Sequence, residues 1–119
     1  MERSFKRWVI QEKDLEGLTP LKARDLIIRC FFEAQKETLA RVKQTLGRET
    51  SDEEIQKSVV NLIKLTFKEV GGSYENPTKK GLGNLVQSLA QKSSAWGTPN
   101  DIIEHHKGEI TKVLKVLKD

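Results

Sequence analysis

The chain has 119 residues, a formal net charge of +4 at pH 7 and a charged fraction of 32%. That length suits a single domain over residues 1–119, because such a chain buries about two-thirds of its unfolded surface but cannot build two substantial cores. The longest strictly apolar stretches, residues 26–28 and 30–32, are far shorter than the ~18 residues that suggest a membrane span. No apolar run follows the charged residues of the N-terminal segment, as a secretory signal requires, so we expect a cytoplasmic protein without a membrane helix.

Each of the three prolines directly follows a residue that can cap a helix, in the pairs Thr19-Pro20, Asn76-Pro77 and Thr98-Pro99. Proline is favoured at the first helical position, and the preceding side-chain oxygen can accept a hydrogen bond from a backbone amide of the first turn. The three pairs therefore predict three helix starts.

Residues 1–18 precede the first predicted helix and are expected to form an arm pinned by Trp8. The first helix is predicted over residues 20–46 and ends before Gly47. It would be about 40 Å long at 1.5 Å per residue, whereas a compact chain of this length is only about 35 Å across. We therefore expect its far end to pack on a second copy, in a homodimer. The candidate protein interface consists of Trp8, Leu39, Val42 and Leu46.

Three further helices are predicted, over residues 52–70, 78–93 and 99–118. The first of them has the clearest signals, because Ser51 and Glu54 match the capping-box pattern at its start and Gly71 follows its end. Gly81 and Gly83 weaken the beginning of the next helix. Since short connections make consecutive helices neighbours, the predicted fold class is all-α, an antiparallel four-helix bundle-like domain with an N-terminal arm.

Few residues could support catalysis or metal binding. Cys30 is the single cysteine, and it lies in an apolar run, so we expect it in the core rather than as a reactive thiol. The two histidines, His105 and His106, are adjacent in a predicted helix, where neighbouring side chains point about 100° apart and rarely bind one ion. We expect His106 on the apolar face and His105 in water. The sequence thus predicts no catalytic residue, no cofactor and no metal ligand.

Lysines with few acidic neighbours form three groups that could contact a polyanion, and the third of them consists of Lys112, Lys115 and Lys118. Lys57, Lys64 and Lys68 share one face of the helix predicted at 52–70. Lys79 and Lys80 lie in a segment without acidic residues, among glycines that we attribute to turns, because their spacing does not match a phosphate-binding loop. No aromatic residue is interleaved among these lysines, as base stacking would need. Nucleic-acid binding is therefore expected to be weak and non-specific.

Three function classes are compatible with the sequence. The leading hypothesis is a small non-enzymatic helical module for protein-protein interaction or structure, mainly because chemical signatures are missing. The alternative is a nucleic-acid-binding protein that uses the basic helix faces. The third is an enzyme whose site the sequence pattern does not reveal.

Overall fold

The computed structural model describes residues 8–41, 51–95 and 97–117, and within these ranges the chain is helical and contains no strand. The elements are a short 3-10 helix, η1 (Glu12–Leu15), and four α-helices, α1 (Pro20–Arg41), α3 (Asp52–Val70), α4 (Lys79–Ala95) and α5 (Asn100–Val116). The predicted all-α fold class is confirmed.

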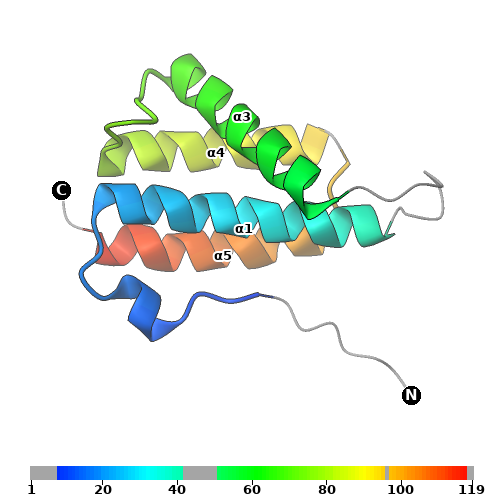
Figure 1. Ribbon diagram of the computed structural model, residues 1–119, viewed down its shortest axis with the longest axis horizontal. Coiled ribbons are helices and arrows are strands. Elements are labelled where there is room, and N and C mark those ends of the chain that lie inside the picture. The colour runs from blue at the N-terminus through cyan, green and yellow to red at the C-terminus, as the bar shows by residue number, and fades with distance from the viewer. Residues whose placement is uncertain (1–7, 42–50, 96, 118–119) are drawn as a thin grey trace.

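The four helices form a closed arrangement in which each contacts two others. Helix α1 packs against α3 and α5, and α4 packs against the same two helices. Figure 1 shows that α1 and α4 run in one direction, that α5 returns in the opposite direction, and that α3 returns at an inclined angle. The result is an antiparallel four-helix bundle, as short connections between amphipathic helices predict.

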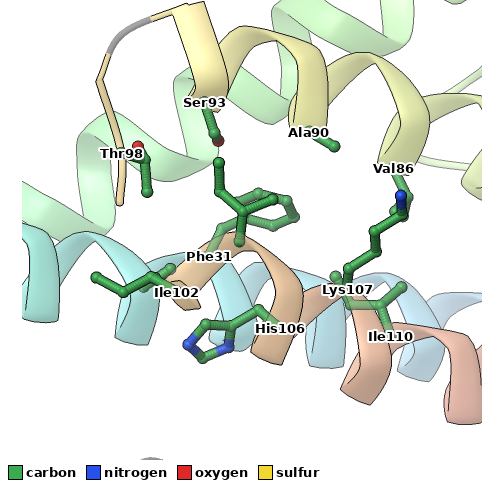
Figure 2. A pocket seen from close by; sticks show the side chains of 11 residues that line it. Phe31, Val86, Ala90, Ser93, Thr98, Ile102, His106, Lys107 and Ile110 are labelled. Carbon is green, nitrogen blue, oxygen red and sulfur yellow. The ribbon is translucent and has the colours of Figure 1, made fainter. Parts of the chain in front are cut away.

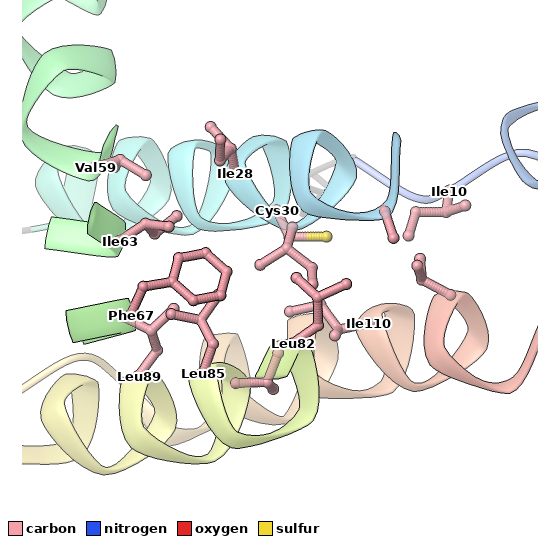
Figure 3. Close-up of a cluster of buried hydrophobic side chains, with 14 of the residues drawn as sticks. Ile10, Ile28, Cys30, Val59, Ile63, Phe67, Leu82, Leu85, Leu89 and Ile110 are labelled. Carbon is pink, nitrogen blue, oxygen red and sulfur yellow. The ribbon is translucent and has the colours of Figure 1, made fainter. Parts of the chain in front are cut away.

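All four helices and the arm contribute to one hydrophobic core. Its largest side chain is Phe67 of α3, which is 1% exposed and lies among leucines of α4 such as Leu85 and Leu89 (Figure 3). Ile27 of α1 and Ile110 of α5 belong to the same cluster. Burying each such side chain stabilises the fold by roughly 1.5–3 kcal/mol, so this shared core holds the elements in place.

Helix α3 has the bounds that its sequence predicts. The amide of Glu54 donates to Oγ of Ser51 at 3.2 Å, and the Glu54 carboxylate accepts from the Ser51 amide at 3.1 Å. At the other end Gly71 has φ 80°, in the left-handed region that favours glycine. Both ends are thus fixed by local hydrogen bonding that the sequence pattern reveals.

Of the three helix starts predicted at prolines, the first is correct and the other two are displaced. The hydroxyl of Thr19 accepts from the amide of Lys22 at 3.2 Å and caps α1. Asn76 does not cap α4, which begins two residues after Pro77, because Thr78 lies directly before the helix and accepts from the Gly81 amide at 3.0 Å.

Thr98 does not cap α5 either. The backbone amide of Thr98 donates to the carbonyl oxygen of Ser93 at 3.0 Å, so this residue belongs to the turn that ends α4. Pro99 occupies the position before α5 and makes no side-chain hydrogen bond there. In both misplaced pairs the proline lies ahead of the helix instead of inside its first turn.

The remaining helix bounds differ from the predicted ones by small amounts. Helix α4 extends to Ala95 instead of residue 93, and α5 covers Asn100–Val116 instead of 99–118. Helix α1 is described as far as Arg41, so its predicted extension to residue 46 lies outside the described residues. Its 22 described residues correspond to a length of about 33 Å.

Candidate interaction surface

Cys30 is a buried core residue, as its apolar neighbours predict. Its side chain is 0% exposed. Burial, helped by the negative charges of Glu109 and Glu33, raises the pKa of the Cys30 thiol to about 12. The thiol is therefore protonated at neutral pH, and a protonated buried thiol is neither a nucleophile nor a metal ligand.

His106 lies on the apolar face of α5, as predicted, and is 3% exposed. It lines a cavity of about 20 Å³ between α1, α4 and α5, where Phe31 stands between α4 and α5 (Figure 2). A cavity of this volume has room for about one water molecule. The cavity is therefore too small to be a ligand site.

No metal centre is formed within the described parts of the chain, where histidine, cysteine and carboxylate side chains do not gather in groups of three or more. Within the same ranges, no helix is long and apolar enough to cross a bilayer.

The arm docks on α5 and covers His105, which the helix pattern alone had placed in water. Nε2 of His105 lies 3.1 Å from the carbonyl oxygen of Trp8 and donates to it, since a carbonyl can only accept. The next α5 turn holds Glu109, whose carboxylate accepts from the Ile10 amide at 2.8 Å. His105 is half-buried as a result. The prediction failed because periodicity within one helix cannot show that another segment covers its polar face.

The predicted protein interface is not brought together in the described residues. Trp8 and Leu39 are both half-buried and pack against the core of their own chain. The Arg29 guanidinium also lies 5.5 Å from the centre of the Trp8 ring. Val42 and Leu46 lie outside the described residues. Much of the apolar surface of Trp8 and Leu39 is thus already used within the chain.

The three predicted polyanion contacts of α3 divide into two groups. Lys57 lines an open hollow at the start of α3 together with Asp52 and Glu53. Lys64 and Lys68 line a different hollow at the other end of the helix. Along the helix axis Lys57 is about 16 Å from Lys68. Lys57 therefore lies beside the acidic first turn of α3. Lys64 and Lys68 are the better candidates for contact with a polyanion.

Tyr74 joins Lys64 and Lys68 from the loop that follows α3. The Arg24 guanidinium lies 4.2 Å from the centre of the Tyr74 ring and donates to the Tyr74 carbonyl oxygen at 2.7 Å. Nζ of Lys64 lies 5.1 Å from the same ring centre. Phe67 packs edge to face against Tyr74, with the ring centres 6.3 Å apart. We call this region the Tyr74 corner and define it by Arg24, Lys64, Leu65, Lys68, Tyr74 and Glu75.

An aromatic residue thus does lie among the lysines, contrary to the expectation from sequence. Tyr74 and Lys64 are ten positions apart in the chain, and the loop folds back to bring them together. The one signal of this reversal in the sequence is the glycine pair Gly71-Gly72, which predicts a turn but not its direction.

Close packing of two glycines places the start of α4 beside this corner. A Cβ atom on Gly72 would lie 2.8 Å from Cδ1 of Phe67 and 3.8 Å from Cα of Gly81. The expectation that these glycines serve turns is correct for Gly71 and Gly72, whose amides donate to carbonyl oxygens in the last turn of α3. Gly72 is also required because a Cβ there would meet the Phe67 ring, and a Cβ on Gly81 would lie 3.2 Å from Oγ1 of Thr78. Lys79 and Lys80 begin α4 next to this contact.

The hollow of the Tyr74 corner has a volume of about 440 Å³ and combines apolar and cationic groups. Leu65 is 52% exposed at its wall, which is unusual for a large apolar side chain in this molecule. Glu75 contributes a carboxylate to the same hollow. This volume falls within the range of ligand-binding clefts.

Some lysines of the molecule form ion pairs and others do not; Lys13, Lys22, Lys107 and Lys115 form none within the described residues. Lys36, Lys92 and Lys112 each pair with a carboxylate, at 3.6, 2.7 and 3.1 Å respectively. Within the described residues, no ion pair includes the predicted polyanion contacts Lys57, Lys64, Lys68, Lys79 and Lys80. The ammonium groups of Lys64 and Lys68 are therefore available to an acidic partner.

Comparisons of the chain with protein-family models, with curated proteins and with solved structures gave no significant match. The geometry of the Tyr74 corner is therefore the basis for the function proposed below.

Proposed function

We propose that this protein is a small non-enzymatic helical module for protein-protein interaction, and that the Tyr74 corner is its contact surface. The observation that carries the proposal is the presence of two lysines without ion pairs, Lys64 and Lys68, beside a half-exposed leucine in a hollow of about 440 Å³. Interfaces typically combine an apolar centre with a polar rim in this way. The buried, protonated state of Cys30 also agrees with a role outside catalysis.

The alternative, nucleic-acid binding through the basic helix faces, has less support at this surface. Single-strand binders offer aromatic faces on which bases stack. The Tyr74 ring already carries the Arg24 guanidinium at 4.2 Å, so this face is occupied. The acidic first turn of α3 also interrupts the lysine stripe near Lys57.

A site-specific crosslinking experiment tests the proposal. A photo-crosslinking amino acid would replace Leu65 in the hollow or, as a matched control, Ser58, which is exposed elsewhere on α3. Irradiation of cells that express the protein should give discrete adducts from position 65 and few from position 58, and protease should digest the attached partner. Adducts that nuclease removes would favour the nucleic-acid alternative, and absence of adducts at position 65 would overturn the proposal.

A further inference from the structure

We infer that the hollow of the Tyr74 corner receives an acidic, extended peptide segment of a protein partner, which places an apolar side chain against Leu65 and carboxylates on Lys64 and Lys68. This inference rests on the proposed interaction function and names the chemistry of the partner. It follows from the spacing of the two lysines, from the exposed leucine that lines the same hollow, and from the groups that already occupy Tyr74.

The spacing of Lys64 and Lys68 matches a peptide in extended conformation. The two residues are one helical turn apart, which is a rise of about 6 Å along α3. In an extended chain, side chains two positions apart point to the same face and are separated by about 7 Å. Carboxylates at alternate positions of a partner segment can therefore reach both ammonium groups, and charge-assisted hydrogen bonds of this kind are among the stronger polar contacts.

Leu65 makes the surface more specific than a simple basic patch. Its side chain is 52% exposed and lines the same hollow as both lysines. An apolar residue of the partner that covers it would remove apolar surface from water on both molecules, which is favourable. The phosphate backbone of a nucleic acid has no apolar side chain to place on Leu65. Dependence of binding on Leu65 therefore distinguishes a peptide from a nucleic acid.

Glu75 sets a limit on the negative charge that the hollow accepts. Its carboxylate lines the same hollow as the two lysines and carries the opposite charge. Asp25 does not add to this effect directly, because it pairs with Arg24 at 2.9 Å. Removing the Glu75 charge should therefore strengthen binding of an acidic segment, whereas removing a lysine charge should weaken it.

Fluorescence anisotropy with three labelled peptides tests the inference on the full chain. The first peptide carries Asp-Ser-Asp next to a leucine, the second replaces both Asp residues by Asn, and the third replaces the leucine by Ser. A single-stranded oligonucleotide is the fourth probe. The acidic peptide with leucine should bind at least roughly fivefold more tightly than either modified peptide, and more tightly than the oligonucleotide at physiological salt.

Variants of the protein assign the binding to the hollow. The double variant Lys64→Gln/Lys68→Gln should weaken binding of the acidic peptide by roughly tenfold, since two charge-assisted contacts are lost. Leu65→Ser should weaken it by about threefold to tenfold, and Glu75→Gln should strengthen it. Lys57→Gln is the matched control, because it removes a charge from the same helix without touching the hollow, and it should have no effect. All of these side chains are exposed, and circular dichroism verifies that each variant is folded.

Three outcomes of the binding assays would overturn the inference: equal binding of two peptides, tighter binding of the oligonucleotide, or no binding of any peptide. Equal binding of the acidic and Asn-containing peptides would remove the charge argument, and tighter binding of the oligonucleotide that is insensitive to Leu65→Ser would assign the surface to nucleic acid. If the peptides fail while position 65 still crosslinks to a protein partner, the interaction function stands and the peptide chemistry is wrong. If position 65 gives no adduct either, both fail.

Discussion

The backbone amide of Ile10 donates a hydrogen bond to the carboxylate of Glu109 at 2.8 Å, although the two residues are 99 positions apart in the chain. Nζ of Lys112 lies 3.1 Å from the second oxygen of the same carboxylate. Ile10 is 7% exposed and Glu109 is also 7% exposed, so water does not replace this contact. Glu109 thus fastens the N-terminal arm to α5.

Removing the Glu109 carboxylate should release the arm. In Glu109→Ala a docked arm would bury the Ile10 amide without its acceptor, which costs about 1–3 kcal/mol and favours the undocked arm. Chemical denaturation should show this loss, and hydrogen exchange at the Ile10 amide should become faster. Glu104→Ala changes an exposed carboxylate on the same helix and should leave both measurements unchanged. Unaltered exchange at Ile10 in Glu109→Ala would contradict the role given to Glu109.

The same carboxylate should make the stability of the fold depend on pH. Burial alone would raise the pKa of Glu109, but the hydrogen bonds from Ile10 and Lys112 and the charges of Lys112 and His105 outweigh it, so the pKa of Glu109 is lowered. A carboxyl whose pKa is lower in the folded than in the unfolded chain adds stability above its unfolded pKa. That stability is lost as pH falls from the ordinary value through the lowered one. Over this interval the wild type should lose more unfolding free energy than Glu109→Gln, and parallel curves would contradict the expectation.

Two glycine substitutions should have opposite effects on stability. A Cβ on Gly72 would lie 2.8 Å from Cδ1 of Phe67, so Gly72→Ala must displace a core ring and should destabilise the fold by about 1–3 kcal/mol. A Cβ on Gly83 meets no atom within 4 Å, and alanine is a better helix former, so Gly83→Ala should stabilise the fold by about 0.5–1 kcal/mol. Thermal or urea denaturation measures both. Equal effects of the two substitutions would show that the Gly72 contact is not tight.

Cys30 should resist thiol reagents in the folded protein. Its side chain is fully buried and its thiol pKa is raised to about 12, so little thiolate exists and the reagent has no access. At mildly alkaline pH, a chromogenic disulfide reagent should label the protein slowly in buffer and rapidly in denaturant. Rapid labelling in buffer would mean that the bundle opens readily around α1.

Self-association through the far end of the first helix stays a prediction. Sedimentation equilibrium at micromolar concentration should show a species heavier than the 13.6 kDa of one chain. Since Trp8 and Leu39 already pack on their own core, the double variant Val42→Ser/Leu46→Ser should reduce the association more than Val9→Ser, which changes an exposed residue of the arm. A single species of monomer mass at all concentrations would remove the dimer.

Features set by neighbouring residues could be predicted from the sequence. The bounds of α3 follow from the Ser51 and Glu54 capping box and from Gly71, which act within one helical turn. The burial of Cys30 and His106 follows from apolar residues at helical spacing. The start of α4 was misplaced because Thr78 caps the helix instead of Asn76, and the start of α5 was misplaced because Thr98 belongs to the turn that ends α4.

Features set by distant residues could not be predicted in this way. His105 is covered by Trp8, which is 97 positions away, and Tyr74 is placed by Arg24, which is 50 positions away. The periodic pattern of a helix such as α1 or α5 does not indicate which distant residue its side chains will contact. The Tyr74 corner was therefore recognised in the sequence only through its lysines, whereas its aromatic residue and its hollow required the folded chain.

The distance along the chain between Ile10 and Glu109 also bears on how the protein folds during synthesis. The arm is synthesised before the four α-helices, and α5, which holds it, follows α1, α3 and α4 in the chain, so the arm can dock only after all four helices have been made. Closing so long a loop is slow compared with pairing of adjacent helices. On a translating ribosome, Trp8 and Ile10 therefore stay undocked from α5 while α1, α3 and α4 are being made, and the N-terminal arm should be the last part of the fold to become protected.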